Sequence, residues 1–414
     1  MSSRASASRP TADRPTVDRQ TVDRLVRALA LTTFLLWLGA STILPLLPEY
    51  LRHRGGSDAT VGLVMAAYFV AALVFQYPAG RLADRIGRRP VLLGGLAVYA
   101  VGSLGFLASP SPVVDIALRG LQGAGAGSAE VAALAMIAST VAIDRRGRAF
   151  GSIYGAQLGG MAVGPLVGSL IGIGAMDVLF IAAGAAALVA GLPALVGASV
   201  AGHDAAGQAG QAAADRPDRW GERRGLPALN RSLVGAVMAA AAFGLTIGVY
   251  ESCWTLLLEL RDAQDWQIGL SWTLFAVPFV VMARPGGWLA DHLDRRRLAV
   301  GALSTSIVLC ALYPFLHSLF WLLVLGSLEA LATAIALPAA QSMLSQWSAA
   351  SEAGRVQGLF STAETGAIAT AAAAGGALFG LAPWAPFVAA AGGAALLTAA
   401  LPVVWGPVAG RVGS

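Results

Sequence analysis

The sequence has few charged residues, only two cysteines and no lysine. Charged residues make up 12% of the 414 positions, whereas 56% are hydrophobic and the mean hydropathy is +0.68. This composition excludes an ordinary soluble domain, because apolar stretches of about 20 residues are typical of bilayer spans. Cys253 and Cys310 lie inside apolar runs, which argues against a disulfide framework or a metal site. We therefore expect a membrane protein with no metal and no other cofactor.

All 28 basic residues are arginine, and they are scattered through short loops between apolar runs. This placement suits anionic lipid headgroups and argues against a nucleic-acid partner. If the N-terminus is cytoplasmic, the outer loops hold only Arg52, Arg54 and Arg261. We therefore predict that both termini are cytoplasmic and that the chain is a multi-pass protein of the cell membrane. Residues 1–24 lack the pattern of a cleaved signal peptide, so we expect the first span to target the chain to the membrane.

The predicted fold is an all-α membrane protein with twelve transmembrane helices. Each helix is long enough to cross about 30 Å of hydrocarbon at about 1.5 Å per residue. The predicted spans are 27–48, 59–79, 90–108, 113–136, 148–172, 176–198, 232–258, 267–285, 298–316, 318–342, 354–380 and 383–406. The predicted parts are a disordered cytoplasmic arm (1–24), an N-terminal six-helix bundle (25–198), a cytoplasmic linker (199–230), a C-terminal six-helix bundle (231–406) and a cytoplasmic tail (407–414).

Two phrases in the sequence occur twice, half a chain apart. "GRLADRIGRRP" begins at Gly80 and "GWLADHLDRRR" at Gly287, while "GRAFG" at Gly147 returns as "GRVQG" at Gly354. Both pairs are 207 residues apart, which indicates an internal repeat. Six spans is an even number, so both halves enter the membrane in the same sense. Two such parallel repeats are typical of secondary transporters, whose substrate site lies between the halves.

These motifs resemble those of the major facilitator superfamily over most of the chain. The first charged phrase is similar to the signature of the loop between spans two and three, and "RGLQGAGAG" from Arg119 resembles the fourth-span motif. The fifth span resembles the antiporter-associated signature, with Ser169 at its final glycine position; the matching residues are Gly151, Gly160, Gly164, Pro165 and Gly168. "PLLPEYL" from Pro45 is similar to the twelve-span drug/proton antiporter branch. Unlike many members of that branch, the first span has no acidic residue at mid-membrane, so a coupling site is expected on other helices.

The repeated phrase is expected to form a cytoplasmic gate. A carboxylate near a helix N-terminus is stabilised by about 0.3–1 kcal/mol. The resemblance implies that Asp84 faces span eleven, and symmetry then places Asp291 against span five. The predicted gate residues are Gly80, Asp84, Arg85, Gly87, Arg88, Asp291 and Arg295. The alternative is that the phrase is only a turn whose arginines fix the orientation of the chain in the membrane.

Five ionisable residues are singled out within the predicted spans, away from the span ends. A charge there costs at least about 2.5 kcal/mol, so each such side chain is expected to face protein. They are Glu364, Glu329, Glu251, Arg119 and Glu130, and none is on a span that the resemblance places at the lipid-facing periphery. A carboxyl group removed from water can bind and release protons near neutral pH. Glu364 and Glu329 are the first candidates for proton coupling, followed by Glu251. The alternative is a static hydrogen bond or ion pair that fixes helix packing.

Candidate residues for a substrate cavity are Trp37, Tyr154, Gln157, Tyr250 and Trp254. Aromatic side chains there suit a partly apolar or cationic ligand, through stacking and cation–π contact. For any one of the aromatic residues, ordinary packing is the competing explanation.

The sequence therefore predicts a secondary active transporter that works by alternating access. The favoured function is proton-coupled efflux of a small, partly hydrophobic molecule or drug by a monomer in the lipid bilayer. The alternative is a facilitator or proton symporter for a sugar or other metabolite. An enzyme is not expected, because no nucleophile–base pair and no metal-ligand cluster occur in the sequence.

Overall fold

The computed structural model describes residues 19–141, 143–214, 231–282, 294–347 and 353–405. Within these ranges the long elements are all α-helices, joined by short turns and single 3₁₀ turns. The N-terminal half consists of α1 (Arg19–Ile43), α2 (Leu47–His53), α3 (Asp58–Ile86), α4 (Arg88–Gly105), α5 (Pro112–Thr140), α6 (Ile143–Ile171) and α7 (Met176–Ala214). The C-terminal half consists of α8 (Arg231–Glu259), α9 (Asp265–Met282), α11 (Arg295–Leu312), α12 (Leu319–Trp347), α13 (Ala353–Leu381) and α14 (Ala385–Trp405).

Nine helical segments in the described ranges are long and apolar enough to cross a membrane. The apolar segment Leu319–Ala334 of α12 is shorter, and α6 and α13 occupy the positions of the predicted fifth and eleventh spans. Large apolar side chains face outward, including Val403 (78% exposed) and Leu396 (77% exposed). This is the surface expected of a protein surrounded by lipid. The all-α membrane fold is confirmed, while the count of twelve spans and the side on which the termini lie remain predictions.

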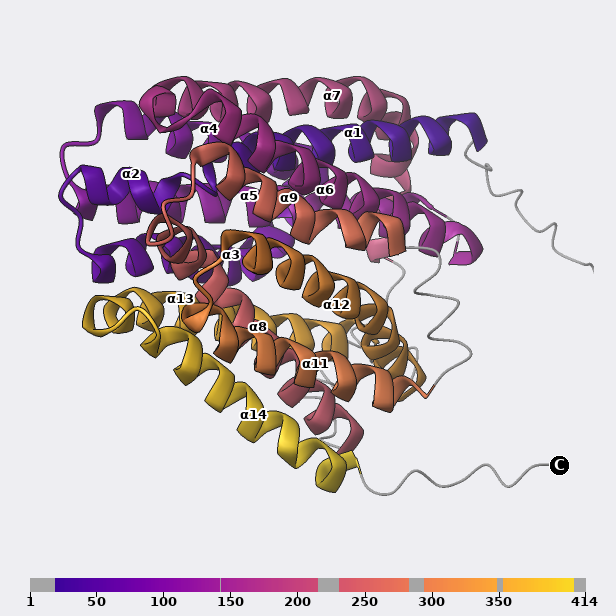
Figure 1. The fold of residues 1–414 in the computed structure, drawn as a ribbon. Coiled ribbons are helices and arrows are strands. Elements are labelled where there is room, and N and C mark those ends of the chain that lie inside the picture. The colour runs from indigo at the N-terminus through magenta and orange to yellow at the C-terminus, as the bar shows by residue number, and fades with distance from the viewer. Residues whose placement is uncertain (1–18, 142, 215–230, 283–293, 348–352, 406–414) are drawn as a thin grey trace, which may run out of the picture.

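The two halves meet through helix pairs that the repeat makes equivalent. In Figure 1 most of the N-terminal half, in indigo to magenta, lies above most of the C-terminal half, in orange to yellow. Helix α3 packs against α13, and α6 packs against α9. A shift of 207 residues carries α3 onto α9 and α6 onto α13, so one contact is the symmetry copy of the other. The parallel repeat predicted from the sequence is thus present in the packing.

The repeated charged phrase adopts two different turns. Gly87 separates α3 from α4 at φ +97°, a backbone region that favours glycine. Asp294 stands at the equivalent place with φ −66°, and its carboxylate accepts the backbone N–H groups of Arg296 (2.9 Å) and Arg297 (3.3 Å). The second copy therefore starts α11 with a capping side chain where the first uses a glycine.

Two predicted irregular segments are partly helical. Helix α7 continues to Ala214, so the first part of the predicted linker 199–230 is helical. Helix α1 begins at Arg19, so the end of the predicted disordered arm is helical as well. The remaining residues of both segments, and the tail 407–414, lie outside the described residues.

Candidate functional site

A cavity of about 530 Å³ lies between the two halves, within the range of sites for drug-sized ligands. Helices α1, α5 and α6 line it from one half and α8, α9, α12 and α13 from the other. Most of the lining is apolar or aromatic. Its ionisable side chains in the described part of the chain are four carboxyl groups and three tyrosines, with no arginine or histidine; the carboxyl groups are Glu130, Glu251, Glu329 and Glu364.

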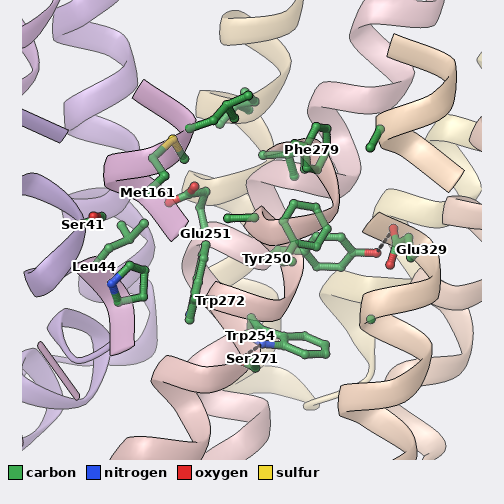
Figure 2. A pocket seen from close by; sticks show the side chains of 18 of the residues that line it. Ser41, Leu44, Met161, Tyr250, Glu251, Trp254, Ser271, Trp272, Phe279 and Glu329 are labelled. Atoms are coloured by element: carbon green, nitrogen blue, oxygen red, sulfur yellow. Dashed lines mark hydrogen bonds between the residues drawn. The ribbon is translucent and has the colours of Figure 1, made fainter. Parts of the chain in front are cut away.

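Glu329 is held by hydroxyl donors. Tyr250 donates to its Oε1 at 2.9 Å and Tyr313 donates to its Oε2 at 2.6 Å, while Ser306 bonds to Oε1 from α11. Figure 2 shows the Tyr250 hydroxyl pointing at Glu329. The Glu329 residue is only 2% exposed. Three donors replace water around this carboxylate, so its buried charge is compensated within the C-terminal half.

This carboxyl group also anchors an aromatic wall of the cavity. The rings of Tyr250, Trp254 and Tyr313 pack edge to face with centroids 5.1–6.1 Å apart. The Trp254 indole N–H donates to Ser271 on α9 at 2.9 Å. Both tyrosine hydroxyls are tied to Glu329, so these rings have fixed orientations and present π surfaces to the cavity.

Glu251 has a different environment. It is 9% exposed and lines the cavity, and its Oε2 has no hydrogen-bond partner. Glu251 follows Tyr250 along α8, and Figure 2 shows the two side chains directed away from each other. Arg119 does not line the cavity. Arg119 donates to Gln122 at 2.8 Å, and its guanidinium lies 4.6 Å from the centroid of the Tyr68 ring.

The other sequence-derived candidates divide into lining and non-lining residues. Glu130 on α5, Tyr154 and Gln157 on α6, and Glu364 on α13 all line the cavity. Trp37 does not; it lies on α1, where its backbone packs against α6. The structure thus places Trp37 outside the described cavity lining, and its role in binding stays a prediction.

The fifth-span motif makes close contacts with α1. A methyl carbon added at Gly160 would lie 2.7 Å from the Leu38 nitrogen, and one at Gly164 would lie 2.6 Å from the Leu38 carbonyl oxygen. One at Gly168 would meet the Thr42 backbone. Small residues thus allow α6 to approach α1 closely, as is typical of membrane helices. Gly151 has open space around it, and Pro165 lines the cavity.

The predicted cytoplasmic gate is only partly within the described residues. Asp84 and Arg85 lie in the last turns of α3 and are exposed, and Arg88 begins α4. Asp84 makes no ion pair with another described residue. Gly80 packs against Val131 of α5. Asp291 lies outside the described residues, as does the side chain of Arg295, so the gate remains a prediction.

Sequence reasoning missed a contact at the opposite end of the bundle. Arg52, at the end of α2, forms an ion pair of 3.2 Å with Glu259, at the end of α8. Thr255 also donates a hydrogen bond of 2.8 Å to the carbonyl oxygen of Pro45. Glu259 follows Arg52 by 207 residues, the repeat offset, and testing other charged pairs at that offset would have found it.

Comparisons with known proteins agree with this architecture. The family description "Major Facilitator Superfamily" matches residues 29–260 and 233–413. The inner membrane transport protein YajR of Escherichia coli (strain K12) is 37% identical over 145 residues, which are 34% of this chain and 31% of that protein. The chloramphenicol resistance protein of Pseudomonas aeruginosa is 36% identical over 135 residues, 32% of each chain. The chain thus spans about a third of the length of these curated relatives.

Solved structures show the same fold. The nucleoside transporter NupG superposes with a TM-score of 0.70 at 13% identity, covering 92% of this chain and 100% of that one. The family match, the helical repeat and the apolar outer surface lead to one conclusion. The chain belongs to the Major Facilitator Superfamily and is a multi-pass membrane protein.

Proposed function

We propose that the protein exports a small, partly hydrophobic molecule in exchange for protons, and that the molecule is neutral or cationic. One observation carries this proposal: the cavity between the halves has aromatic walls and four carboxyl groups but no basic residue among its described lining. Aromatic faces attract apolar groups and cations. An anionic substrate would meet only negative charge there and would be repelled.

Glu251 and Glu364 are the proton carriers in this scheme. Both line the cavity, and no hydrogen bond to a described residue engages the Glu251 Oε2 or the Glu364 carboxyl group. A carboxyl group in such a place binds either a proton or a cationic ligand, which makes the two compete for one site. Glu329 has a different role, because its three hydroxyl donors already compensate its charge. Glu329 orients the aromatic wall.

The curated relatives support export over uptake. One of them is named a chloramphenicol resistance protein, and removal of a toxic compound from the cell is a direct route to resistance. The protein is proposed to act as a monomer, because the cavity is completed by the two halves of one chain.

The test is transport by the purified protein in liposomes with an imposed pH gradient. Tetraphenylphosphonium serves as a cationic probe and chloramphenicol as a neutral one. We expect a probe to move against its own gradient while protons move the other way. Glu251→Gln should abolish this coupling, whereas Glu49→Gln, outside the cavity, should leave it intact. Movement of neither probe and no proton flux would refute the proposal.

Uptake of a metabolite is the second candidate function. It is favoured by the first span, where α1 places Ser41 but no carboxyl group at the cavity. The same liposomes separate the two functions. If a sugar or nucleoside enters together with protons and the two probes do not move, the uptake function holds.

A further inference from the structure

Arg52 and Glu259 are an unusual ion pair, because each occupies the other's position in the repeat. Adding the offset of 207 to 52 gives 259. The two side chains nevertheless touch, with 3.2 Å between Arg52 Nη1 and Glu259 Oε2. Two residues related by a twofold axis contact each other only when both lie beside that axis. The pair therefore marks the point where the pseudo-twofold axis leaves this end of the bundle.

Glycine contacts flank the ion pair on both sides of the axis. On α3, a methyl carbon added at Gly62 would lie 2.6 Å from the Ala372 carbonyl oxygen and 2.9 Å from the Gly376 nitrogen of α13. On α9, one added at Gly269 would lie 2.5 Å from the Pro165 carbonyl oxygen of α6 and would run into the Ser169 side chain.

These two contacts are symmetry copies. Gly62 and Gly269 are 207 residues apart, and so are Ser169 and Gly376. We call these four residues, together with Arg52 and Glu259, the axial seam. Across the axial seam, helices of opposite halves lie close enough that a single methyl group would not fit without movement. Ser169, which stands at the final glycine position of the antiporter-associated signature, belongs to the axial seam.

Two aspartates extend the axial seam, again at the repeat offset. Asp58, at the start of α3, pairs with Arg52 at 3.4 Å. Asp265, at the start of α9, accepts the backbone N–H of Ile173 from the opposite half at 2.8 Å. The equivalent carboxylates thus have different tasks: Asp58 helps to hold the axial arginine, and Asp265 binds the other half directly.

The axial seam lies directly beyond the cavity. Leu44 and Trp254 line the cavity, and the residues that follow them, Pro45 and Thr255, form the hydrogen bond between the halves. The cavity is therefore bounded at this end by contacts that separate when the halves tilt apart. The sequence prediction puts the same end on the outer face of the membrane, since the arginine-rich loops lie at the other.

We propose that the axial seam is the outer gate of the transporter, and that the Arg52–Glu259 ion pair on the axis is its latch. The latch is made while the cavity is shut off from the outside and breaks when it opens outward. The repeat brings one residue from each half to the axis. An exact repeat would place two like charges there, whereas this chain has Arg52 in one half and Glu259 in the other. The proposal does not depend on which substrate is carried or on proton coupling.

The first test measures the distance between spin labels in the intact protein by double electron–electron resonance. Val113 and Phe320 are repeat-related, exposed positions at the starts of α5 and α12, and each can be replaced by cysteine for labelling. The native cysteines are fully buried. Arg52→Glu and Glu259→Arg should each raise the ratio of open to closed populations at least about twofold, the scale of a partly exposed ion pair.

The charge swap makes this test specific. Arg52→Glu combined with Glu259→Arg restores an attractive pair, and the population ratio should return toward that of the unaltered protein. Arg261→Glu is the control, because Arg261 lies at the same end but bonds only to carbonyl groups of its own half among the described residues. The latch is refuted if neither single variant changes the distances, or if the swap leaves the change in place.

The second test addresses the glycines. Gly62→Ala and Gly269→Ala should each hold the axial seam apart and increase the open population, because the methyl group meets backbone or a buried side chain. Gly94→Ala on α4 is the control, since that position has open space. Equal populations in Gly269→Ala and Gly94→Ala would overturn the assignment of the axial seam as a gate.

Discussion

Replacing Glu329 by glutamine is expected to lower the stability of the fold. This result would distinguish Glu329, whose role is structural, from the proposed proton carrier Glu251. The carboxylate accepts three hydrogen bonds from hydroxyl groups, one of them 2.6 Å long. Glutamine keeps one oxygen and puts an NH₂ group where the second oxygen was. At least one of the three hydroxyl groups then faces the NH₂ group of glutamine, which is a hydrogen-bond donor, where it faced an acceptor oxygen before. The hydrogen bonds that remain are made to a neutral oxygen and no longer to a charged one. A hydrogen bond to a charged group contributes about 1.5–3 kcal/mol, so the expected loss of unfolding free energy is about 2 kcal/mol.

The matched control is Glu251→Gln on the neighbouring helix α8. The Glu251 Oε2 has no partner, so removing its charge breaks no hydrogen bond there and relieves the cost of burial. We expect Glu251→Gln to leave the unfolding free energy within about 0.5 kcal/mol of the unaltered protein or to raise it.

Thermal unfolding in one detergent, with probe transport measured on the same preparations, provides the assay. Glu329→Gln should lower the melting temperature and reduce transport in proportion to the loss of folded protein. Glu251→Gln should melt as the unaltered protein does and lose coupling. The reasoning is refuted if Glu329→Gln is fully stable and Glu251→Gln is not.

Three further predictions concern packing and capping. Asp294→Ala removes the cap of α11 and should lower the unfolding free energy by about 1 kcal/mol, measured by thermal unfolding; no change would mean that the cap is unimportant. Gly168→Ala should destabilise the protein by about 1–3 kcal/mol, because the methyl group meets the backbone of α1, whereas Gly151→Ala in open space should be neutral, and equal stabilities would contradict the packing. Cys253 and Cys310 should not react with a maleimide until the protein unfolds, and fast labelling of the folded protein would show that their burial is wrong.

Much of the fold followed from features that are local in the sequence. Apolar runs of the right length predicted the helices, and two phrases at one offset predicted the repeat that the packing of α3 on α13 and α6 on α9 confirms. Glycine spacing on the fifth span indicated a small helix face, and Gly160, Gly164 and Gly168 do lie against α1. Such signals depend on a single helix or on an exact repeat, so one sequence is sufficient to show them.

The roles of the carboxyl groups did not follow from the sequence. Glu329 and Glu251 look alike as lone acids in apolar runs, but the donors to Glu329 come from α8, α11 and the turn after α11. Nothing in the spacing of those hydroxyl groups shows that they converge. The surroundings of Trp37 did not follow from the sequence either, because the α1 backbone there packs against Gly160 of α6, which lies far along the chain.

Proton release on ligand binding tests the central claim most directly. The purified protein is placed in unbuffered detergent solution with a pH indicator, and tetraphenylphosphonium is added. If the cation and a proton compete for the cavity carboxyl groups, binding should release protons from the unaltered protein and far fewer from Glu251→Gln. Binding of the cation without any proton release, or equal release from a Glu251→Gln, Glu364→Gln double variant, would contradict the account.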